Sequence, residues 1–522
     1  MQKLESYVLD RWHVGSGKPA ILHDPTSEEA LASCDASGID MAAVVRHGRE
    51  VGGPALRALT FAQRGKLLKA LSAAIHEKRE ELIELSIKNG GSTRGDAKFD
   101  IDGATGTLAA YAHLGKELGD RRFLSDGEGV QLGRTARFWG QHVRTSKRGV
   151  AVHINAFNFP AWGMMEKLAC SILAGVPVIE KPGTPTALVA WRIARITVES
   201  GLLPAGAYQF ICGSVGDLLT HLRGQDCLAF TGSAGTGAKL RAHPALVANS
   251  VAVNVEADSL NAAVLAPDVD ASDEAYGLFL RNVAQDVTQK TGQKCTAVRR
   301  VLVPAARLDE VAKDLATDLS RIVVGDPADS ATRMGPVASK SQFEDVRAGI
   351  ERLKAVGRIV CGGLDKPRDK GYFVAPTVFV VESEEGRAEV NRDEVFGPVV
   401  ALLPYDGSAN EAARFVSEGG GSLVASAYSN DADWIEAFVL EAAPFSGRLW
   451  IGSAKSAEQS LPPGMVLPSM VHGGPGRAGG GEELGGLRGL EFYTQRTAVQ
   501  GYKGVVEGRF GATREATTAG AE

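Results

Sequence analysis

The stretch "GVAVHINAFNFPAWGMMEKLACSILAGVPVIEKPG", residues 149–183, decides the fold. An apolar run leads into a polar loop, a helical segment then closes on a glycine, and a second apolar run ends in Glu-Lys-Pro-Gly. The order strand, helix, strand predicts two parallel strands of one sheet with a helix on its face. Ligands of such sheets bind beyond the carboxyl ends of the strands, so the polar residues there are candidate functional residues.

The alternation continues along the chain. "YQFICGSVGDLLTHLRG" (208–224) and "CLAFTGSAGTGAKLRAHP" (227–244) each repeat a strand, a glycine turn and a helix. A second α/β segment follows, in which "KGYFVAPTVFVV" (370–381) and "GPVVALLPYDG" (397–407) read as strands. Upstream, residues 58–90 predict one amphipathic helix that ends at a glycine pair. Because a chain of 522 residues is too long for one core, we expect an α/β fold with two or three domains.

The composition excludes several classes of partner. The net charge of −5 argues against nucleic-acid binding and against an anionic membrane surface. No apolar run approaches the roughly 18 residues of a membrane span, and the charged start does not resemble a signal peptide. Six cysteines without paired spacing favour a reducing cytoplasm. No Cys-x-x-Cys or His-Glu-x-x-His pattern occurs and the histidines do not cluster, so no protein metal site is expected.

Cys295 lies in "VTQKTGQKCTAVRR" (287–300), among small and basic residues. A reactive thiolate needs partial access and nearby positive charge or oriented amides, and Lys294, Arg299 and Arg300 could supply the charge. The other five cysteines lie mostly in apolar or glycine-rich settings, where a small buried side chain is the usual role. The sequence therefore predicts a nucleophile at Cys295, with a structural cysteine as the alternative.

Five short segments occur in a fixed order along the chain: "NAFNFP" (155–160), "EKPGTPT" (180–186), "FTGSAGTG" (230–237), "GQKCTAVRR" (292–300) and "DEVFGPVV" (393–400). Each segment alone is weak, since glycine-rich turns are common. Together, at these spacings, they resemble the aldehyde dehydrogenase superfamily over most of the chain. The resemblance implies a Rossmann-type cofactor domain, an α/β catalytic domain and a small oligomerisation hairpin.

The expected domain bounds follow from this resemblance. The hairpin is expected to protrude and to pair with a strand near the C-terminus. A hairpin alone is marginal in water, so we expect it to dock on a second subunit in a homodimer or homotetramer. The bounds are 1–133 and 149–255 for the dinucleotide-binding domain, 256–487 for the catalytic domain, 134–148 and 488–507 for the oligomerisation strands, and 508–522 for a fraying tail.

Three residues are expected to carry the chemistry. The Cys295 thiolate would attack an aldehyde to give a thiohemiacetal that surrenders a hydride. Asn158, with the Cys295 backbone N–H, would stabilise the alkoxide, as the matching asparagine does in the family; Asn155 is the weaker candidate. Glu256, at the end of an apolar strand, would activate the water that releases the acid, with Asp258 as its rival. The family's glutamate is usually followed by a leucine and two glycines, which are absent here.

The resemblance also implies a nicotinamide dinucleotide. Lys181 matches the lysine that meets the adenosine ribose. Three residues later, NAD-preferring members often have a glutamate, where this chain has Thr184. A hydroxyl beside an ammonium accommodates a 2′-phosphate, whereas a carboxylate would repel it. We therefore predict NADP over NAD, the alternative being that Thr184 only caps the following helix.

Further cofactor contacts are expected at two other segments. Gly232 and Ser233 lie at a strand-to-helix turn, where free amides suit a pyrophosphate. Glu394 matches the family's glutamate that holds the nicotinamide ribose, and Phe396 is expected to pack nearby. The alternative for Glu394 is an ordinary surface carboxylate.

The segment "HGGPGRAGGGEELGGLRGLEFYTQRTAVQG" (472–501) bears on the substrate. It resembles the C-terminal part of ring-cleavage semialdehyde dehydrogenases of the phenylacetate and benzoate routes, whose substrates carry a coenzyme A thioester. Residues 472–489 are expected to form an ordered loop. We therefore predict NADP-dependent oxidation of a CoA-linked semialdehyde to the acid.

Three rival functions stay open at this point. A CoA-acylating enzyme would use free CoA in place of water, which retention of Glu256 disfavours. A catalytically silent dinucleotide-binding scaffold is disfavoured by Cys295, Asn158 and Glu256 together. A thiol hydrolase is disfavoured because the sequence places no histidine beside Cys295.

Overall fold

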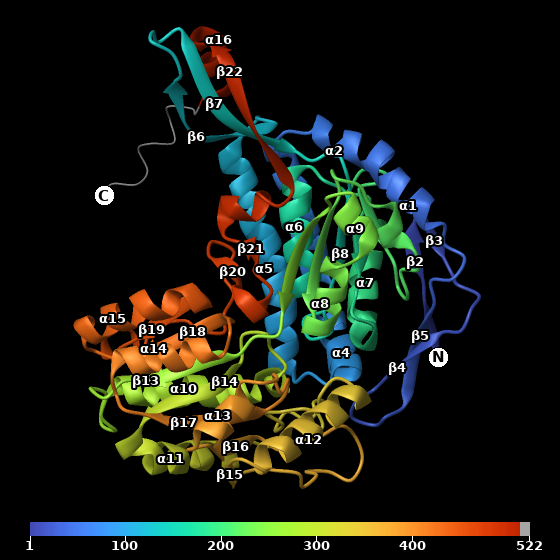
Figure 1. Ribbon diagram of the computed structural model, residues 1–522. Coiled ribbons are helices and arrows are strands. Elements are labelled where there is room, and N and C mark those ends of the chain that lie inside the picture. The colour runs from blue at the N-terminus through green and yellow to red at the C-terminus, as the bar shows by residue number, and fades with distance from the viewer. Residues whose placement is uncertain (512–522) are drawn as a thin grey trace.

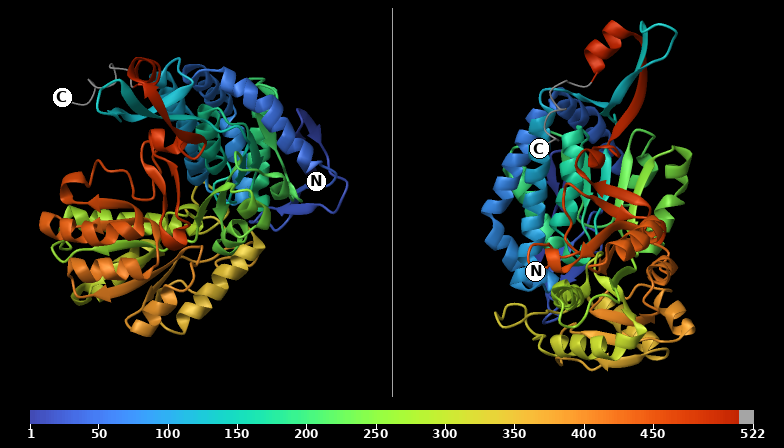
Figure 2. Two further views of the ribbon diagram at one scale, coloured as in Figure 1. Left: turned by 45° about the horizontal axis from the view of Figure 1, so that its top comes forward. Right: turned by 90° about the vertical axis from the view of Figure 1, so that its left-hand side faces the viewer.

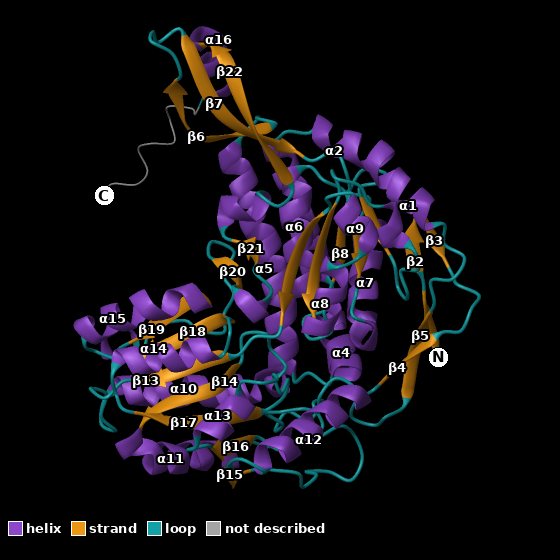
Figure 3. Ribbon diagram, viewed as in Figure 1, coloured by secondary structure: helices purple, strands orange, loops and turns teal. Residues whose placement is uncertain are grey.

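The computed structural model describes residues 1–511. Its body contains two seven-stranded sheets with helices packed around them, and a separate arm projects from the body (Figure 1, Figure 3). A smaller sheet, ordered β1-β5-β4, lies near the N-terminus; its strands are β1 (Gln2–Leu4), β4 (Ala20–His23) and β5 (Ala30–Cys34). The structure confirms the predicted α/β fold.

The first large sheet holds the segment at 149–183. Its strands, in spatial order, are β12 (Ala252–Ala257), β11 (Cys227–Gly232), β8 (Ala151–Ile154), β9 (Val178–Lys181), β10 (Tyr208–Phe210), β2 (Ser6–Val8) and β3 (Arg11–His13). The strands from β12 to β10 are parallel, whereas β2 and β3 add an antiparallel edge. Helix α6 (Trp162–Ala174) connects β8 to β9 in the chain, and the two strands pair in parallel, as predicted.

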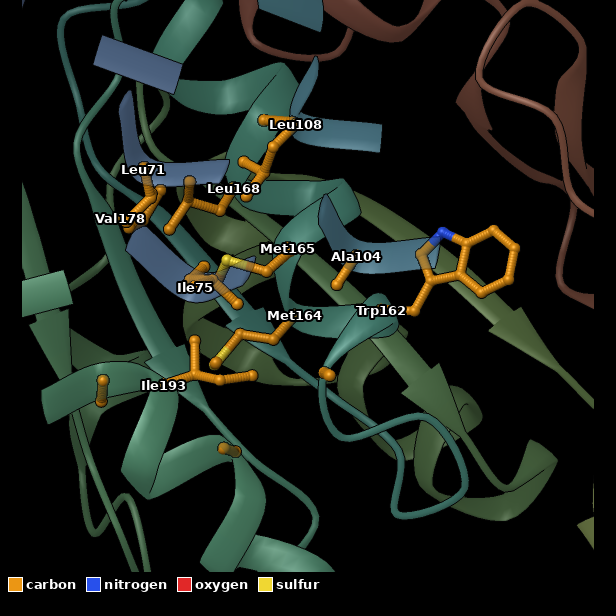
Figure 4. Packing of buried hydrophobic residues seen from close by; sticks show 14 of the residues in the cluster. Leu71, Ile75, Ala104, Leu108, Trp162, Met164, Met165, Leu168, Val178 and Ile193 are labelled. Carbon is orange, nitrogen blue, oxygen red and sulfur yellow. The ribbon is translucent and has the colours of Figure 1, made fainter. Parts of the chain in front are cut away.

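Helices cover both faces of this sheet. Val178 packs into one buried cluster and its neighbour Ile179 into another, because successive side chains of a strand point to opposite faces. Figure 4 shows the larger cluster, in which Leu71, Leu168 and Met165 gather beside Val178. The α-helices in these two clusters are α2 (Gly53–Ala58), α3 (Phe61–Glu77), α4 (Arg79–Gly90), α5 (Arg94–Leu118), α6 and α7 (Ala187–Glu199) in the larger, and α1 (Met41–His47), α8 (Ala234–Arg241) and α9 (Pro244–Ala248) in the smaller.

The single helix predicted for residues 58–90 is wrong in one respect, because the structure has two helices there. Thr60 and Gln63 form a capping box that begins α3. Lys78 leaves the helical region, with φ −98° and ψ 16°, and separates α3 from α4. The break lets both helices pack against α5. The predicted end at the glycine pair is confirmed, since Gly91 closes α4 with φ 65°.

The second sheet contains a strand within each of the segments predicted at 370–381 and 397–407, although the first strand is shorter than predicted and begins only at Thr377. Its strands, in spatial order, are β15 (Arg358–Cys361), β16 (Thr377–Val380), β17 (Val399–Tyr405), β14 (Val298–Pro304), β13 (Asn261–Leu265), β18 (Ser422–Tyr428) and β19 (Ser446–Gly452). All neighbours are parallel except β15 with β16. Helices α10 (Glu274–Thr288) and α11 (Leu308–Ser320) pack in one cluster, and α12 (Lys340–Lys354), α13 (Glu384–Val390), α14 (Ala409–Glu418) and α15 (Ala432–Ala442) in another.

The arm is larger than the predicted hairpin. It is a three-stranded antiparallel sheet, ordered β22-β7-β6, whose strands are β22 (Thr494–Tyr502), β7 (Phe138–Ser146) and β6 (Phe123–Gln131), and the arm also carries helix α16 (Lys503–Phe510). The bounds 134–148 therefore omit β6. The predicted tail from residue 508 overlaps α16, and its remainder, 512–522, lies outside the described residues. Figure 2 shows the arm projecting from the body in both views. The domain bounds stay a prediction.

The glycine-rich stretch at 472–489 is ordered and forms a short hairpin. Strands β20 (Val471–Gly474) and β21 (Gly481–Leu484) pair antiparallel beside β12. A Cβ at Gly479 would lie 2.1 Å from the Val255 carbonyl oxygen, and one at Gly481 would lie 2.4 Å from Asn254 Oδ1. Glycine is thus required where the hairpin touches the strand that ends in Glu256. Within residues 1–511, no helix combines the length and the apolar character needed to cross a membrane.

Candidate active site

A cleft of about 530 Å³ opens at the carboxyl ends of the first sheet. Its walls bring together segments from both large sheets, and it reaches Cys295. The sequence-predicted residues that line it are Asn158, Gly232, Ser233, Glu256, Cys295, Glu394 and Phe396, together with the two rivals Asn155 and Asp258. Lys181 and Thr184 do not line it, although Gly183 and Pro185 do.

Cys295 lies in the loop before β14, and hydrogen bonds fix the backbone of this loop. Asn261, at the start of β13, donates from Nδ2 to the backbone oxygens of Cys295 at 2.7 Å and of Ala297 at 2.9 Å. Residues Lys290 and Thr291 have positive φ values of 51° and 56°, which curl the chain just before the cysteine. The sulfur is thereby presented at a half-buried position.

The basic side chains beside Cys295 do not face the sulfur, so that expectation was wrong. Lys294 Nζ lies 2.6 Å from Asp286 Oδ1, in a buried ion pair. Arg299 Nε lies 3.0 Å from Glu394 Oε1, and Arg300 donates to the Leu260 carbonyl oxygen. These cations order the loop and the cleft wall. The basic residues near Cys295 in the sequence thus point away from its sulfur in the fold.

The groups that do face the sulfur are Glu256 and His472. His472 Nε2 lies 3.9 Å from Cys295 Sγ and 3.3 Å from Glu256 Oε1. Burial and the negative charge of Glu256 raise the pKa of the Cys295 thiol well above its usual value. Burial opposes ionisation of Glu256, but the charges of His472 and Lys167 outweigh it and lower the pKa of the carboxyl. Burial opposes protonation of His472 too, yet Glu256 raises its pKa overall.

His472 corrects the expectation that no histidine accompanies Cys295. It lies on β20, opposite Glu483 on β21, and only 3% of its surface is exposed. The sequence offered one weak signal, a histidine that begins a glycine-rich run. His472 lies near Cys295 because the hairpin of β20 and β21 packs against β12. No local sequence pattern predicts that packing.

A group of ionisable side chains lies behind Glu256. Lys167 Nζ, from α6, is 3.1 Å from Glu483 Oε2 and 3.5 Å from Glu166 Oε1. Oxygen atoms of Glu166, Glu256 and Glu483 lie within 4.8 Å of one another. Burial raises the pKa of Glu166 to about 8, although the Lys167 ammonium acts against this. Lys167 therefore lies among three buried carboxyl groups and partly offsets their charge.

The two asparagines differ in what their amides contact. Asn158 Nδ2 donates to the Gln293 carbonyl oxygen at 3.0 Å, which fixes the amide beside the cysteine loop. Asn155 Nδ2 instead donates to the buried Glu180 Oε2 at 2.8 Å. Among the described residues, the Cys295 backbone N–H has no hydrogen-bond acceptor. Asn158 and this N–H are thus the donors next to the sulfur.

Glu256 and Asp258 also differ in their surroundings. Glu256 is 2% exposed, and neither of its oxygens accepts a hydrogen bond within the described part of the chain. Asp258 Oδ2 is 2.7 Å from Arg477 Nη2, in an ion pair on the cleft wall. Asp258 also has a positive φ of 21°. Glu256 is consequently the carboxylate that faces Cys295, while Asp258 is held by an arginine.

A second, smaller cavity of about 40 Å³ also borders Cys295. Its walls include Phe99, Phe159 and Trp162, whose rings pack edge to face at centroid distances of 5.2 to 6.0 Å. Asn158, Glu256 and His472 line it too. This cavity, the aromatic channel, thus borders the sulfur and shares Asn158, Glu256 and Cys295 with the wide cleft.

The ammonium group of Lys181, at the end of β9, precedes Thr184 by three residues in the chain. Lys181 Nζ donates to the Pro182 carbonyl oxygen at 2.8 Å, and burial lowers the pKa of the ammonium. The adjacent Glu180 is fully buried and bonded to His153 at 2.7 Å, so it points away. Thr184 begins a short 3₁₀ turn, Thr184–Thr186, and makes no side-chain capping bond.

The turn after β11 can accept an anion. Ser233 is the N-cap of α8, and its Oγ accepts from the Thr236 backbone N–H at 3.4 Å. A Cβ at Gly232 would lie 2.6 Å from the Phe230 ring, so glycine keeps this wall open. The open turn at Gly232 and Ser233 and the volume of the wide cleft both suit a bound dinucleotide.

The far end of the cleft carries Glu394 and Phe396. Burial raises the pKa of Glu394, although Arg299 acts against this, and Glu394 Oε2 also accepts from the Ser259 backbone N–H at 3.3 Å. Phe396 packs edge to face with Phe157 at 5.9 Å. Glu394 lines the cleft, and its side chain is 11% exposed and paired with Arg299, so it is not an ordinary exposed surface carboxylate.

Comparison with known proteins relates this geometry to a family. The model of the aldehyde dehydrogenase family matches residues 12–499. The chain is 42% identical over 479 residues to the 3,4-dehydroadipyl-CoA semialdehyde dehydrogenase of Aromatoleum evansii, covering 91% of this chain and 93% of that protein. It is 29% identical to the geranial dehydrogenase of Castellaniella defragrans, covering 79% and 83%.

Solved structures show the same fold. An NAD+ complex of the aldehyde dehydrogenase from Bacillus cereus superimposes with a TM-score of 0.83 at 24% identity, covering 96% of this chain and 97% of that one. Betaine aldehyde dehydrogenase from Staphylococcus aureus gives 0.84 at 23% identity, covering 96% and 98%. The family match over nearly the whole chain and the 42% identical relative lead to one conclusion. The chain belongs to the aldehyde dehydrogenase family.

Proposed function

We propose that this protein oxidises a CoA-linked semialdehyde to its carboxylic acid with NADP, through a covalent intermediate on Cys295. The observation that carries the proposal is the convergence of Cys295, Glu256 and Asn158 where two cavities meet. The wide cleft suits a dinucleotide and the narrow channel suits an aldehyde. Similarity to a 3,4-dehydroadipyl-CoA semialdehyde dehydrogenase supports the substrate class, and with it a place in aerobic benzoate degradation.

In the first half of the reaction, the Cys295 sulfur attacks the aldehyde carbon and the C=O bond becomes a C–O⁻ bond. The thiol proton leaves toward Glu256 or His472, the two bases beside the sulfur. Asn158 Nδ2 and the Cys295 N–H stabilise the oxyanion. The bound nicotinamide supplies the hydride acceptor. Loss of hydride leaves a thioester on Cys295.

In the second half, Glu256 takes a proton from water as the water attacks the thioester carbon. The C–S bond breaks, the acid forms, and the sulfur regains a proton. Glu256 suits this role because its oxygens accept no hydrogen bond from the described residues and it lies beside the sulfur. The role separates this enzyme from a CoA-acylating one, in which CoA would replace water.

Replacement of Asn158 tests the oxyanion donors. We expect Asn158→Ala to lower kcat by about 10²–10³-fold, because loss of one such donor has that effect. The KM for aldehyde should change much less, since the donor acts on charge that develops during attack. Steady-state kinetics measure both values. Asn155→Ala is the comparison, and a larger loss of kcat there would assign the role to Asn155.

The cofactor preference rests on Thr184 and Lys181. We expect Thr184→Glu to shift the ratio of kcat/KM for NADP over NAD by about tenfold or more toward NAD, since one repulsive contact with a 2′-phosphate has about that effect. Thr184→Gln, similar in size but neutral, should change the ratio much less. Initial rates with both cofactors measure it. Wild-type preference for NAD, or equal shifts in both variants, would contradict the assignment.

A substrate screen tests the function itself. The enzyme should oxidise a CoA-linked semialdehyde with a much higher kcat/KM than the matched aldehyde without CoA. The product should be the free acid, identified by mass spectrometry. Equal rates for both aldehydes would remove the CoA-linked class. Turnover that needs free CoA and yields an acyl-CoA would instead identify a CoA-acylating enzyme.

The arm supports a proposed homodimer or homotetramer. Several apolar side chains on it are strongly exposed, among them Val130 at 54% and Tyr502 at 64%. A three-stranded sheet that leaves such residues uncovered suits docking on a second subunit. Light scattering with size exclusion gives the number of chains. All six cysteines are unpaired, which supports a reducing compartment such as the cytoplasm.

A further inference from the structure

Three kinds of ligand atom converge at the cysteine. Cys295 Sγ, His472 Nε2 and a carboxylate oxygen of Glu256 lie within 4.8 Å of one another. They come from the loop before β14, from β20 and from β12, which are far apart in the chain. Thiolate, imidazole and carboxylate are the ligands that zinc takes in proteins. No short sequence motif indicates this group, because its three residues are far apart in the chain, so the expectation of no metal site did not cover it.

The separations between these atoms suit a tetrahedral ion. With zinc about 2.3 Å from sulfur and about 2.0–2.1 Å from nitrogen and oxygen, tetrahedral angles place N and O about 3.3 Å apart and S and N about 3.6 Å apart. The structure has 3.3 Å between His472 Nε2 and Glu256 Oε1, and 3.9 Å between His472 Nε2 and Cys295 Sγ. These two separations lie within a few tenths of an ångström of the tetrahedral values, and the third, from Cys295 Sγ to a Glu256 oxygen, is within 4.8 Å.

The proposed ligand atoms are close partners of one another. His472 Nε2 lies 3.3 Å from Glu256 Oε1 and 3.9 Å from Cys295 Sγ. Within the described residues, the buried oxygens of Glu256 accept no further hydrogen bond. A metal ion among the three groups would take the place of the ion pair between His472 and Glu256 as the partner of the carboxylate.

The ion can reach the site. Cys295 and Glu256 line both cavities, so the sulfur is open from the wide cleft and from the aromatic channel. A fourth coordination position facing either cavity can hold water. An entry path and an open position are features of accessible zinc sites, in contrast to closed structural ones.

We propose that Cys295, His472 and Glu256 form an inhibitory zinc site. Zn²⁺ binds the Cys295 thiolate, the His472 imidazole and the Glu256 carboxylate, and the thiol proton is released to solvent. The ion occupies the nucleophile and the base of the proposed function, so aldehyde oxidation stops until a chelator removes it. Zinc binding itself does not depend on that function and can be measured without aldehyde or dinucleotide.

Cobalt titration tests the site directly. The reduced, chelator-treated full-length enzyme is titrated with Co²⁺ in the absence of substrate and cofactor. We expect one Co²⁺ per chain, with visible bands of four-coordinate cobalt and a near-ultraviolet thiolate-to-metal charge-transfer band. Added Zn²⁺ should remove both signals. A saturating spectrum without the charge-transfer band would overturn the proposal, because it would exclude the sulfur.

Variants then identify the ligands. Cys295→Ala should lose the charge-transfer band, and His472→Phe should weaken Zn²⁺ binding by at least about 100-fold, since loss of an outer partner alone costs about 10–100-fold. Cys361→Ala removes the other half-buried cysteine, and His142→Phe removes an exposed histidine of the arm. Both control variants should bind as the wild type does. Unchanged binding in His472→Phe would overturn the site.

Protection of Cys295 from alkylation tests the zinc site in the wild-type enzyme, so this test does not depend on whether a variant folds. Zn²⁺ should slow carboxamidomethylation of Cys295 by iodoacetamide in the wild-type enzyme, measured by peptide mass spectrometry. Cys361 in the same sample is the internal control and should react at an unchanged rate. Equal reaction of Cys295 with and without saturating Zn²⁺ would contradict the proposal, whatever the substrate of the enzyme.

Discussion

Cys295→Ala should abolish aldehyde oxidation while dinucleotide binding persists. Removal of a covalent nucleophile costs enzymes about 10⁴–10⁶-fold in kcat, because the remaining groups cannot form the intermediate. Asn158, Glu256 and the residues lining the far parts of the cleft stay in place, so the binding surface is intact. Stopped-flow production of the reduced nicotinamide cofactor measures the chemistry, and the change in its fluorescence measures binding.

The control for this variant is the other half-buried cysteine. Cys361 ends β15 at the edge of the second sheet, and it lines neither the wide cleft nor the aromatic channel. Cys361→Ala should therefore keep the burst and the turnover of the wild type. Oxidation that survives in Cys295→Ala would remove the covalent mechanism, and equal loss in both variants would indicate damage to the fold.

The fold could be predicted from local patterns. The segment at 149–183 alternates strand, helix and strand, and β8, α6 and β9 occur there in a parallel sheet. Parallel strands place their carboxyl ends at one edge, so motifs distant in the chain were expected to meet. Asn158, Glu256 and Cys295 do line the same two cavities. Their roles stay predictions.

The electrostatics of the site could not be predicted in this way. Lys294 is adjacent to Cys295 in the sequence, but its side chain points to Asp286, in a buried pair at 2.6 Å. His472 lies far along the chain, but its imidazole reaches the sulfur, because glycines let β20 and β21 pack against β12. Adjacency in the sequence does not determine where a side chain points. The groups that set the charge at Cys295 are thus tertiary neighbours.

Glu256→Gln should separate the two halves of the reaction. Hydride transfer needs Cys295 and the oxyanion donors, so one equivalent of the reduced nicotinamide cofactor should still form in a burst. Hydrolysis of the thioester then lacks its base, and steady-state turnover should fall by about 10²–10⁴-fold, the usual contribution of a general base. Rapid-quench mass spectrometry should find the acyl group on Cys295. A variant that turns over at the wild-type rate would show that another group activates the water.

Asp258→Asn distinguishes the rival carboxylate. Asp258 is paired with Arg477 at 2.7 Å, so its removal should loosen the cleft wall and lower stability without a stall at the thioester. Glu256 lies beside the sulfur with no hydrogen-bond donor on its oxygens among the described residues, so water can occupy that place. Only the carboxylate that contacts the attacking water can leave an acyl-enzyme behind when it is neutralised. Accumulation of acyl-enzyme in Asp258→Asn, with normal turnover in Glu256→Gln, would reverse the two assignments.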